Sequence, residues 1–291
     1  MRFILFGNTY QSKKSVHIQR FFYLCHELGI ELYVDAPFYD FIKQELHAGQ
    51  EPAGVFTGDD FWGDIAVSLG GDGTFLQAAS RIGPKEIPIL GINTGRLGFL
   101  ADTSPDDMEE MLHHVLEGTH SVRPRKVLQT ILEGEHTLQS CPYALNEVAV
   151  LKRDISSMIT IHTEVNGEYL NTYQADGLIV ATPTGSTAYS LSVGGPIMVP
   201  QTDILALTPV APHSLSMRPI VMRDDAVVKL DIKSRSHNFL IAIDGRSEGC
   251  EEGVQLTIRK ADYVVKIVQQ PDSSFFGTLR TKMMWGADAR K

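Results

Sequence analysis

The sequence predicts an α/β domain with an open parallel sheet, followed by a second domain made mainly of β-strands in a layered or sandwich-like arrangement. Before about residue 121, short apolar runs alternate with amphipathic helical stretches, which is typical of a parallel sheet with helices between its strands. After that point, apolar and polar residues alternate with a period of two, and no comparable helices intervene. We expect domains at 1–121 and 122–270, with the segment 271–291 packing back on the first.

The elements of the first domain each have their own signal. Apolar runs predict strands at 3–6, 30–34, 65–69 and 87–93. Helical patterns predict helices at 16–24, closed by Gly29, and at 41–47. A further helix is expected to begin with Ser104 as N-cap and Pro105 in the first helical position, and to end near Gly118. Ligands of such folds bind at the carboxyl ends of the parallel strands.

The second domain shows strand and turn signals. Residues 159–165 alternate with period two and lead into Asn166-Gly167, a dipeptide typical of a tight hairpin. Further strands are expected at 228–233, 254–258 and 264–268. The run at 275–284 predicts a short helix in the C-terminal segment.

Composition excludes several classes of protein. The 291 residues carry a net charge of −9 without a basic run, which argues against a nucleic-acid partner. Cys25, Cys141 and Cys250 lie far apart, so we expect reduced thiols and neither a disulfide nor a zinc site. No charged segment leads into an apolar signal region, and no run approaches the roughly 20 apolar residues that span a bilayer. We therefore expect a cytoplasmic protein without membrane contact.

A glycine-rich loop lies where the strand at 65–69 gives way to a helix. It consists of Gly70, Gly71, Asp72, Gly73 and Thr74. Backbone N–H groups in such a loop approach phosphate oxygens closely, and a helix N-terminus favours negative charge. An aspartate there repels phosphate, so metal binding or removal of a hydroxyl proton is expected of it, and either role indicates a phosphotransferase. The alternative is a tight turn in which the aspartate only caps the helix.

The same loop lacks two common nucleotide signatures. No Gly-Lys-Ser/Thr follows at the P-loop spacing, and the third glycine of the dinucleotide fingerprint is replaced by Leu76. A hydride-transfer enzyme of the Rossmann type is accordingly disfavoured.

Four further polar segments stand out, and three of them have both a functional and a structural interpretation. The hydroxyl-rich, glycine-containing block at 176–196 suits sugar and phosphate recognition, or else forms helix caps. Asn146 and Glu147 follow an apolar run, and an amide can pair with an adenine edge while a carboxylate accepts from ribose hydroxyls. Taken alone, the pair is better interpreted as the end of an exposed strand. Asp244-Gly245-Arg246 predicts a turn after the strand at 240–243. Arg96 is either a phosphate clamp or a surface charge.

Taken in order, these motifs resemble the NAD kinase family, whose members phosphorylate the 2′-hydroxyl of the adenosine ribose of NAD with ATP. The resemblance rests on the segments 70–74, 93–100, 146–147, 176–196 and 244–246 and spans nearly the whole chain. It implies an α/β domain and a β-rich domain with the ligand between them. The Gly-Gly-Asp-Gly core alone also occurs in lipid kinases and phosphofructokinases.

The resemblance implies a role for each matching residue. Asp72 corresponds to the general base, and the implied NAD-binding set is Asp72, Gly73, Asn146, Glu147, Ser157, Gln174, Asp176, Thr187, Ala188, Tyr189, Ser190, Leu191, Ser192 and Asp244. Asp244 is expected to reach across a subunit interface of a homo-oligomer, a dimer or tetramer. Candidates for the phosphates of ATP are Gly70, Gly71, Thr74, Arg96 and Arg246. A divalent cation, Mg²⁺, is expected with ATP, and no residue is assigned to it as a ligand.

Two other functions stay open at this point. A lipid or sugar-phosphate kinase with the same glycine core is one, although a lipid kinase should show a basic or amphipathic membrane-facing stretch, and none is evident. A non-catalytic dinucleotide-binding regulator is the other, but it would have no need for an aspartate at Asp72.

Overall fold

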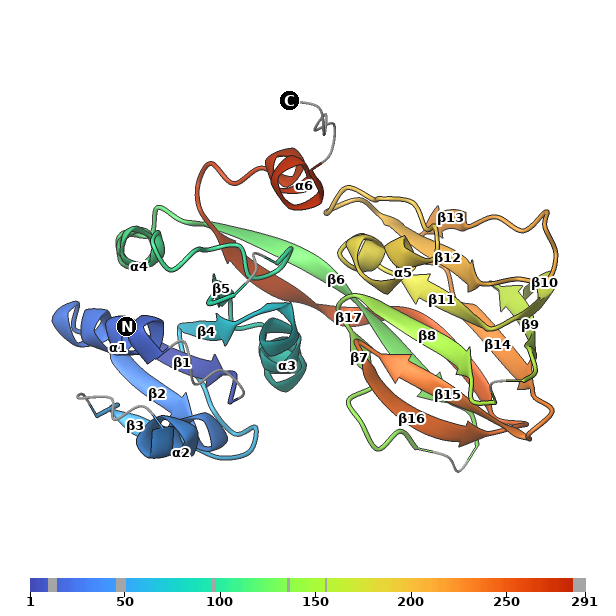
Figure 1. Ribbon diagram of the computed structural model, residues 1–291, viewed down its shortest axis with the longest axis horizontal. Helices are drawn as coiled ribbons and strands as arrows, with labels where there is room; N and C mark the ends of the chain where they lie inside the picture. The colour runs from blue at the N-terminus through green and yellow to red at the C-terminus, as the bar shows by residue number, and fades with distance from the viewer. Residues whose placement is uncertain (10–14, 46–50, 96–97, 135–136, 155, 285–291) are drawn as a thin grey trace. The chain divides into compact units, whose positions relative to one another are not determined.

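The computed structural model describes residues 1–9, 15–45, 51–95, 98–134, 137–154 and 156–284 (Figure 1). The chain forms two compact units: Met1–Pro124 together with Val265–Lys291, and Arg125–Val264. Two long strands, β6 (Ser121–Leu132) and β17 (Gln255–Gln269), carry the chain from one unit to the other. No helix in the described part of the chain is long and apolar enough to cross a membrane.

The first unit contains the expected parallel sheet. Its strands follow the order β5-β4-β1-β2-β3, and every pair among them is parallel. Their bounds are β1 (Arg2–Gly7), β2 (Glu31–Asp35), β3 (Gly54–Phe56), β4 (Ile65–Gly70) and β5 (Ile89–Asn93). The parallel sheet is thereby confirmed, and β3 is an additional edge strand that the sequence analysis did not predict.

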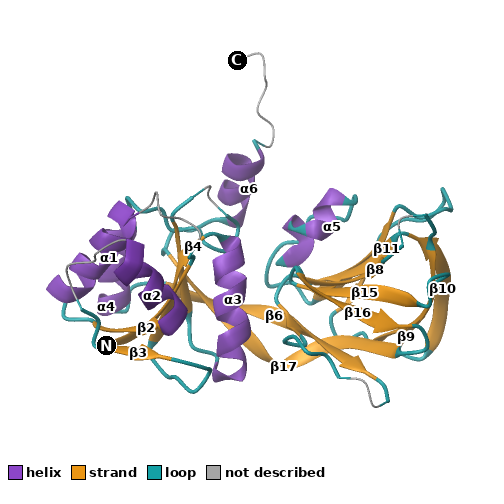
Figure 2. Cartoon of the chain, turned by 60° about the horizontal axis from the view of Figure 1, so that its bottom comes forward, coloured by secondary structure: helices purple, strands orange, loops and turns teal. Residues whose placement is uncertain are grey.

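Helices cover both faces of this sheet (Figure 2). One buried cluster joins alternate strand residues to α1 (Ser15–Glu27), α2 (Ala36–Glu45) and α4 (Met108–Glu117). The helix α3 (Asp72–Ile82) lies on the opposite face, where a Cβ on Gly91 of β5 would meet the ring of Phe75 at 2.9 Å. A short 3-10 helix, η2 (Gly83–Lys85), follows it. The expected helix at 41–47 is the second half of α2, and its last two residues lie outside the described part.

The helix expected to begin at Ser104 begins later. Ser104 forms a turn in which its hydroxyl accepts the N–H of Asp107 at 3.2 Å and donates to the Asp107 carboxylate at 2.7 Å. These local bonds satisfy the backbone outside a helix, so α4 starts only at Met108. Its predicted end is correct, because Gly118 takes the left-handed conformation with φ +70°.

The C-terminal segment packs on the first unit, as expected. The helix α6 (Phe275–Met283) begins at Ser274, whose hydroxyl accepts the N–H of Gly277. Just before it, the Ser273 hydroxyl donates to the Asp102 carboxylate at 3.4 Å.

The second unit consists of layered antiparallel sheets, which confirms the predicted β-rich architecture. One sheet has the order β13-β12-β11-β8-β15-β16, and the other contains β10-β9-β14-β17 with β6 and β7 beside them. Apolar side chains of both form one buried cluster. The bounds are β7 (Tyr143–Ala144), β8 (Glu147–Lys152), β9 (Ile159–Val165), β10 (Glu168–Ala175), β11 (Gly177–Ala181), β12 (Ile204–Val210), β13 (Ile220–Arg223), β14 (Val228–Lys233), β15 (Asn238–Ile243), β16 (Arg246–Glu251), η3 (Gly185–Thr187) and α5 (Tyr189–Ser192).

In this unit the predicted hairpin turn is confirmed, and two predicted strands are corrected to one. The hairpin between β9 and β10 turns at Asn166 and Gly167, whose φ angles of +54° and +80° fit the predicted tight turn. The strands expected at 254–258 and 264–268 are instead parts of the single strand β17. The polar residues between them, including Arg259 and Lys260, do not interrupt the strand.

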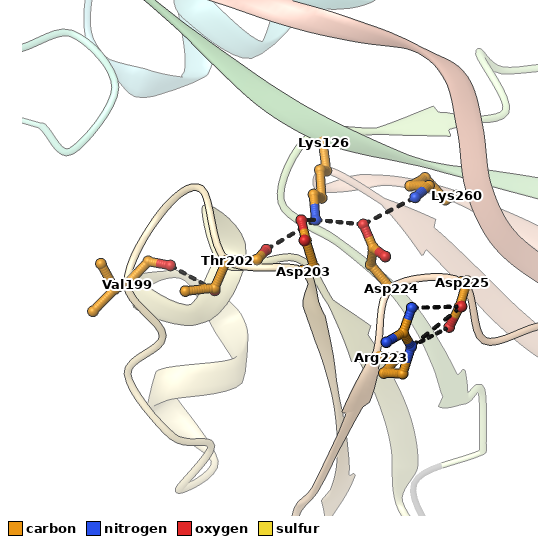
Figure 3. A network of polar contacts seen from close by, with 8 residues as sticks. All are labelled: Lys126, Val199, Thr202, Asp203, Arg223, Asp224, Asp225 and Lys260. Carbon is orange, nitrogen blue, oxygen red and sulfur yellow. Dashed lines mark hydrogen bonds and ion pairs between the residues drawn. The ribbon is translucent and has the colours of Figure 1, made fainter.

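A buried aspartate joins the two connecting strands inside the second unit (Figure 3). Asp224 is 4% exposed and forms ion pairs with Lys126 of β6 and, at 3.0 Å, with Lys260 of β17. Burial alone would raise the pKa of Asp224, but the two lysines outweigh burial and hold that pKa below its usual value. Lys126 also contacts Asp203 at 2.5 Å. The network therefore ties β6 to β17 near the points where both strands leave the unit.

Candidate active site

The carboxylate of Asp72 joins two sequence motifs of the first unit. Asp72 begins α3 immediately after β4, with Gly71 as the N-cap. Its two oxygens accept the backbone N–H groups of Phe99 at 2.8 Å, Leu100 at 3.1 Å and Ala101 at 3.0 Å. A carboxylate offers about four lone-pair sites, so roughly one remains for a further donor. The glycine loop and the segment 98–101 thus form one site around a fixed carboxylate.

The side chain of Asn93 bonds to the backbone of two later residues, Gly95 and Ala101. Its side-chain oxygen accepts the N–H of Gly95 at 2.6 Å, and its side-chain nitrogen donates to the carbonyl of Ala101 at 3.4 Å. Asn93 is 2% exposed at the end of β5, the strand next to β4. Arg96, a candidate phosphate clamp, lies outside the described residues.

The glycines of the loop differ in what surrounds them. A Cβ on Gly70 would overlap the Thr74 hydroxyl, so Gly70 is required by packing within the turn. At Gly71 and Gly73 no described atom lies within 4 Å of an added Cβ. Open space therefore adjoins the N-terminus of α3, where backbone N–H groups and the helix dipole favour an anion.

Gly98 offers a direct test of the fixed carboxylate. A Cβ at this position would overlap the Asp72 carboxylate, so Gly98→Ala must displace either the carboxylate or the segment 98–101. We expect the kcat of a reaction in which Asp72 takes part to fall by up to about 100-fold, because a misplacement of about 1 Å can cost that much. The matched control is Gly277→Ala in α6, where the added Cβ would lie 3.6 Å from the Cβ of Ser274, an ordinary van der Waals contact. Equal kcat values for both variants would contradict the fixed position of Asp72.

Two charged residues near Asp72 were missed by the sequence analysis. Asp102 accepts from the side chains of Gln269 at 3.1 Å and Ser273 at 3.4 Å, and burial raises its pKa. Lys282 of α6 places its ammonium 4.8 Å from the ring centre of Phe99, and within the described part of the chain its buried Nζ has no hydrogen-bond partner. Burial lowers the pKa of Lys282, while Asp72 and Asp102 act in the opposite direction. These contacts join residues far apart in the chain, so no local pattern marks them.

In the second unit, Asn146 and Glu147 lie where β8 begins. The Asp244 carboxylate accepts the backbone N–H groups of Leu145 at 2.7 Å, Asn146 at 2.8 Å and Glu147 at 3.2 Å. Glu147 is 7% exposed, and the backbone N–H of Tyr189 donates to its carboxylate. Burial, and then the nearby Asp244, raise the pKa of Glu147 to about 7. Its Oε2 has no partner among the described residues.

The hydroxyl-rich block contacts the segment 145–147 through Thr182 and Gly185. The Thr182 hydroxyl donates to the carbonyl of Leu145 at 2.6 Å, and the Thr182 N–H donates to the carbonyl of Asn146 at 2.9 Å. A Cβ on Gly185 would overlap that Asn146 carbonyl. The block and the Asn146-Glu147 pair are therefore in direct contact.

Several hydroxyls of this block bind the fold itself. The Ser186 hydroxyl donates to the carbonyl of Pro183 at 2.7 Å, and the Thr187 hydroxyl donates to that of Thr184 at 3.3 Å. The buried Ser190 hydroxyl lies 3.2 Å from that of Thr208. The structural interpretation thus accounts for these three hydroxyls.

Other predicted NAD contacts lie elsewhere in the second unit. Asp176 pairs with Lys152 at 2.7 Å, and its neighbour Gly177 pairs with Leu151, four positions along β8 from Glu147. That separation is about 14 Å at roughly 3.4 Å per residue. Gln174 is exposed on β10, and the Ser157 hydroxyl donates to Asp154 at 3.3 Å. Within one chain the structure therefore separates Asp176 from Glu147.

The guanidinium of Arg246 also binds its own chain. It donates to the backbone carbonyl of Tyr143 at 2.9 Å and of Cys141 at 3.5 Å. Its proposed contact with phosphate stays a prediction.

Searches for related proteins agree on one family. The residues 3–120 match a family model described as the ATP-NAD kinase N-terminal domain, and residues 145–270 match the ATP-NAD kinase C-terminal domain. The chain is 58% identical over 290 residues to an NAD kinase of Bacteroides fragilis, covering 100% of both. It is 41% identical to an NAD kinase of Porphyromonas gingivalis over 98% of both.

Solved structures show the same fold. Yeast NADH kinase complexed with NADH aligns with a TM-score of 0.87 at 23% identity, covering 99% of this chain and 89% of the yeast chain. An NAD kinase from Archaeoglobus fulgidus in complex with ATP aligns with a TM-score of 0.75 at 26% identity, covering 97% of this chain and 99% of the other.

Proposed function

This chain belongs to the NAD kinase family, and we propose that it transfers a phosphoryl group from ATP to the 2′-hydroxyl of the adenosine ribose of NAD, giving NADP. The observation that supports the site of transfer is the Asp72 carboxylate, fixed by three backbone N–H groups beside the open space at Gly71 and Gly73. The other functions that the glycine core allowed, a lipid or sugar-phosphate kinase and a non-catalytic regulator, are not favoured by these relatives.

Asp72 is proposed as the general base. A ribose hydroxyl is a poor nucleophile, and a positioned carboxylate accepts its proton as the oxygen attacks phosphorus. The bonds to Phe99, Leu100 and Ala101 fix the direction of the remaining lone pair, and alignment is the main requirement of phosphoryl transfer. Gly70, Gly71 and Thr74 are proposed to face the phosphates of ATP at the N-terminus of α3. The Thr74 N–H itself donates to the carbonyl of Gly71 at 3.0 Å.

Asn146 and Glu147 are proposed to bind the adenosine part of NAD, with Gly73 and the segment 187–192 as further contacts. The N–H of Tyr189, which already bonds to Glu147, brings that segment to the same place. Ser157, Gln174 and Asp176 remain proposed contacts on the family resemblance. The separation of Asp176 from Glu147 along β8 supports a contact of Asp176 with a different part of the dinucleotide.

A divalent cation accompanies ATP in this proposal, and we propose Mg²⁺. No group of three or more His, Cys, Asp or Glu side chains within the described ranges is arranged to hold a metal. Mg²⁺ usually keeps several waters and binds through substrate phosphates, so the ion would enter with ATP and neutralise phosphate charge. A cytoplasmic location and a homo-oligomer, dimer or tetramer, are proposed on the sequence and the family resemblance alone.

The deciding assay mixes the purified chain with NAD, ATP and Mg²⁺ and detects the product with an NADP-specific dehydrogenase. We expect NADP to accumulate in proportion to enzyme and to depend on the divalent ion. Parallel reactions with NADH as acceptor and polyphosphate as donor define the substrate range. Absence of NADP under every condition would overturn the proposal.

A further inference from the structure

The turn formed by Asp244 and Gly245 has its own backbone geometry. It joins β15 to β16 with φ angles of +48° and +79°, the left-handed pair of a two-residue hairpin. Aspartate tolerates this region better than most residues do. In this geometry the Asp244 side chain turns back toward residues 145–147 of its own chain, and the Asp244 N–H donates to the carbonyl of Glu147 at 3.1 Å.

Two residues together bind the whole backbone of the segment 145–147. Its three N–H groups donate to the Asp244 carboxylate. The carbonyls of Leu145 and Asn146 accept from Thr182, and the carbonyl of Glu147 accepts from Asp244. Each backbone polar group of the segment thus has a partner on Asp244 or Thr182, which fixes the directions in which the Asn146 and Glu147 side chains leave the chain.

We propose that Asp244 is a positioning residue for NAD, which orients Asn146 and Glu147 from within the same chain and does not itself contact the nucleotide. The inference rests on the proposed NAD site. It differs from the expectation that Asp244 reaches across a subunit interface, because a carboxylate that accepts three N–H groups has roughly one lone pair left. Arg246 supports the hairpin through its bond to the carbonyl of Tyr143.

Asp244→Asn tests this role with little change in shape. The amide keeps one acceptor oxygen, and its NH₂ group would face backbone N–H donors that need an acceptor. Leaving a buried donor unsatisfied costs about 1–3 kcal/mol, so we expect KM for NAD to rise about 5- to 150-fold. KM for ATP is expected to stay within about twofold. The control is Asp225→Asn in the same unit, an exposed carboxylate bound to Arg223, which is expected to leave both constants unchanged.

The pH dependence of NAD binding is a second measurement, which a loss of stability alone would not change. Glu147 faces Asp244 and the N–H of Tyr189, and Asp244 in turn interacts with Arg246 and Tyr263. Removing the negative charge of Asp244 lowers the pKa of Glu147. The pH at which NAD binding weakens should therefore move to lower values in Asp244→Asn, but not in Asp225→Asn.

A second variant keeps the proposal testable if Asp244→Asn fails to fold. Thr182→Val removes the hydroxyl that holds the Leu145 carbonyl and keeps the Thr182 N–H, so a smaller rise in KM for NAD with unchanged KM for ATP is expected. Calorimetric NAD binding is measured beside turnover, because it tests Asp244 even if the chain forms no NADP. Unchanged NAD affinity in folded Asp244→Asn, or in Thr182→Val where the first variant does not fold, would overturn the proposal.

Discussion

Replacing Asp72 with asparagine is expected to lower kcat for NADP formation by about 10²- to 10⁴-fold, the range typical of a lost general base. Asparagine is close in size to aspartate but cannot take the ribose proton. One oxygen remains to accept N–H groups from the segment 98–101, so the loop loses part of its anchoring. The dissociation constant for NAD is expected to change by less than about threefold, because Asn146 and Glu147 are untouched.

The measurement combines steady-state kinetics, calorimetric NAD binding and thermal unfolding. Asp106→Asn is the matched control, since that carboxylate is exposed in the same unit. A drop in kcat without loss of NAD binding or of folded protein assigns the base. A kcat within about tenfold of the wild type would exclude that role for Asp72.

Replacing Glu147 with glutamine is expected to stabilise the protein at pH 8 while it weakens NAD binding. The pKa of Glu147 is about 7 in the folded chain, against 4.5 for the free side chain. Between these values the folded state retains a proton that the unfolded state has lost, so this residue lowers the free energy of unfolding as pH rises from about 4.5 to 7. The penalty is complete above pH 7 and is about 3 kcal/mol at 1.36 kcal/mol per unit.

Glutamine carries no charge and removes this penalty. We expect the free energy of unfolding of Glu147→Gln to exceed that of the wild type by about 2–3 kcal/mol at pH 8 and by little at pH 4.5. Denaturant unfolding at several pH values measures the difference. Glu168→Gln, an exposed residue of β10, should show no such pH-dependent gain. Equal stability of Glu147→Gln and wild type at pH 8 would show that the buried charge carries no penalty.

The same substitution weakens the site. A hydrogen bond from a ribose hydroxyl to a carboxylate is worth about 1.5–3 kcal/mol, so its loss is expected to raise the dissociation constant for NAD by about 10- to 150-fold. In the wild type, NAD binding should likewise weaken as pH falls below 7, where Glu147 takes up a proton. Stability is therefore reduced at a residue whose charge the proposed NAD contact needs.

Local patterns predicted the elements whose signals are local. The parallel strands β1, β2, β4 and β5 were visible as apolar runs, and the hairpin at Asn166 was visible as a dipeptide. The strand β3 has only three residues, too few to show a period. The start of α4 was predicted too early, because Ser104 bonds to Asp107 in a turn that precedes the helix. A serine followed by acidic residues occurs both in such turns and at helix N-caps, so the local sequence does not distinguish the two.

The residues of the candidate site also divide into those that a local pattern marks and those that it does not. Asp72 was predicted from its motif, because glycines mark it in the sequence, whereas the Asn146-Glu147 pair was assigned only through the family resemblance. The contacts of Lys282 with the Phe99 ring and of Thr182 with Leu145 join residues 183 and 37 positions apart (282 − 99 and 182 − 145). Such pairs depend on how the strands are ordered in the sheets, which no single segment encodes.

The first sheet is completed late in synthesis, because one of its strands, β17, lies near the C-terminal end of the sequence. Ile267 and Val268 pair with Ile89 and Leu90 of β5, so the last strand to leave the ribosome is the one that closes the first sheet. The backbone of Thr103 pairs with β5 at Gly91 and Asn93, so the part of its edge that waits for β17 is Ile89 and Leu90. A chain that ends before Val265 would lack this pairing, and we expect it to expose the edge at Ile89 and Leu90.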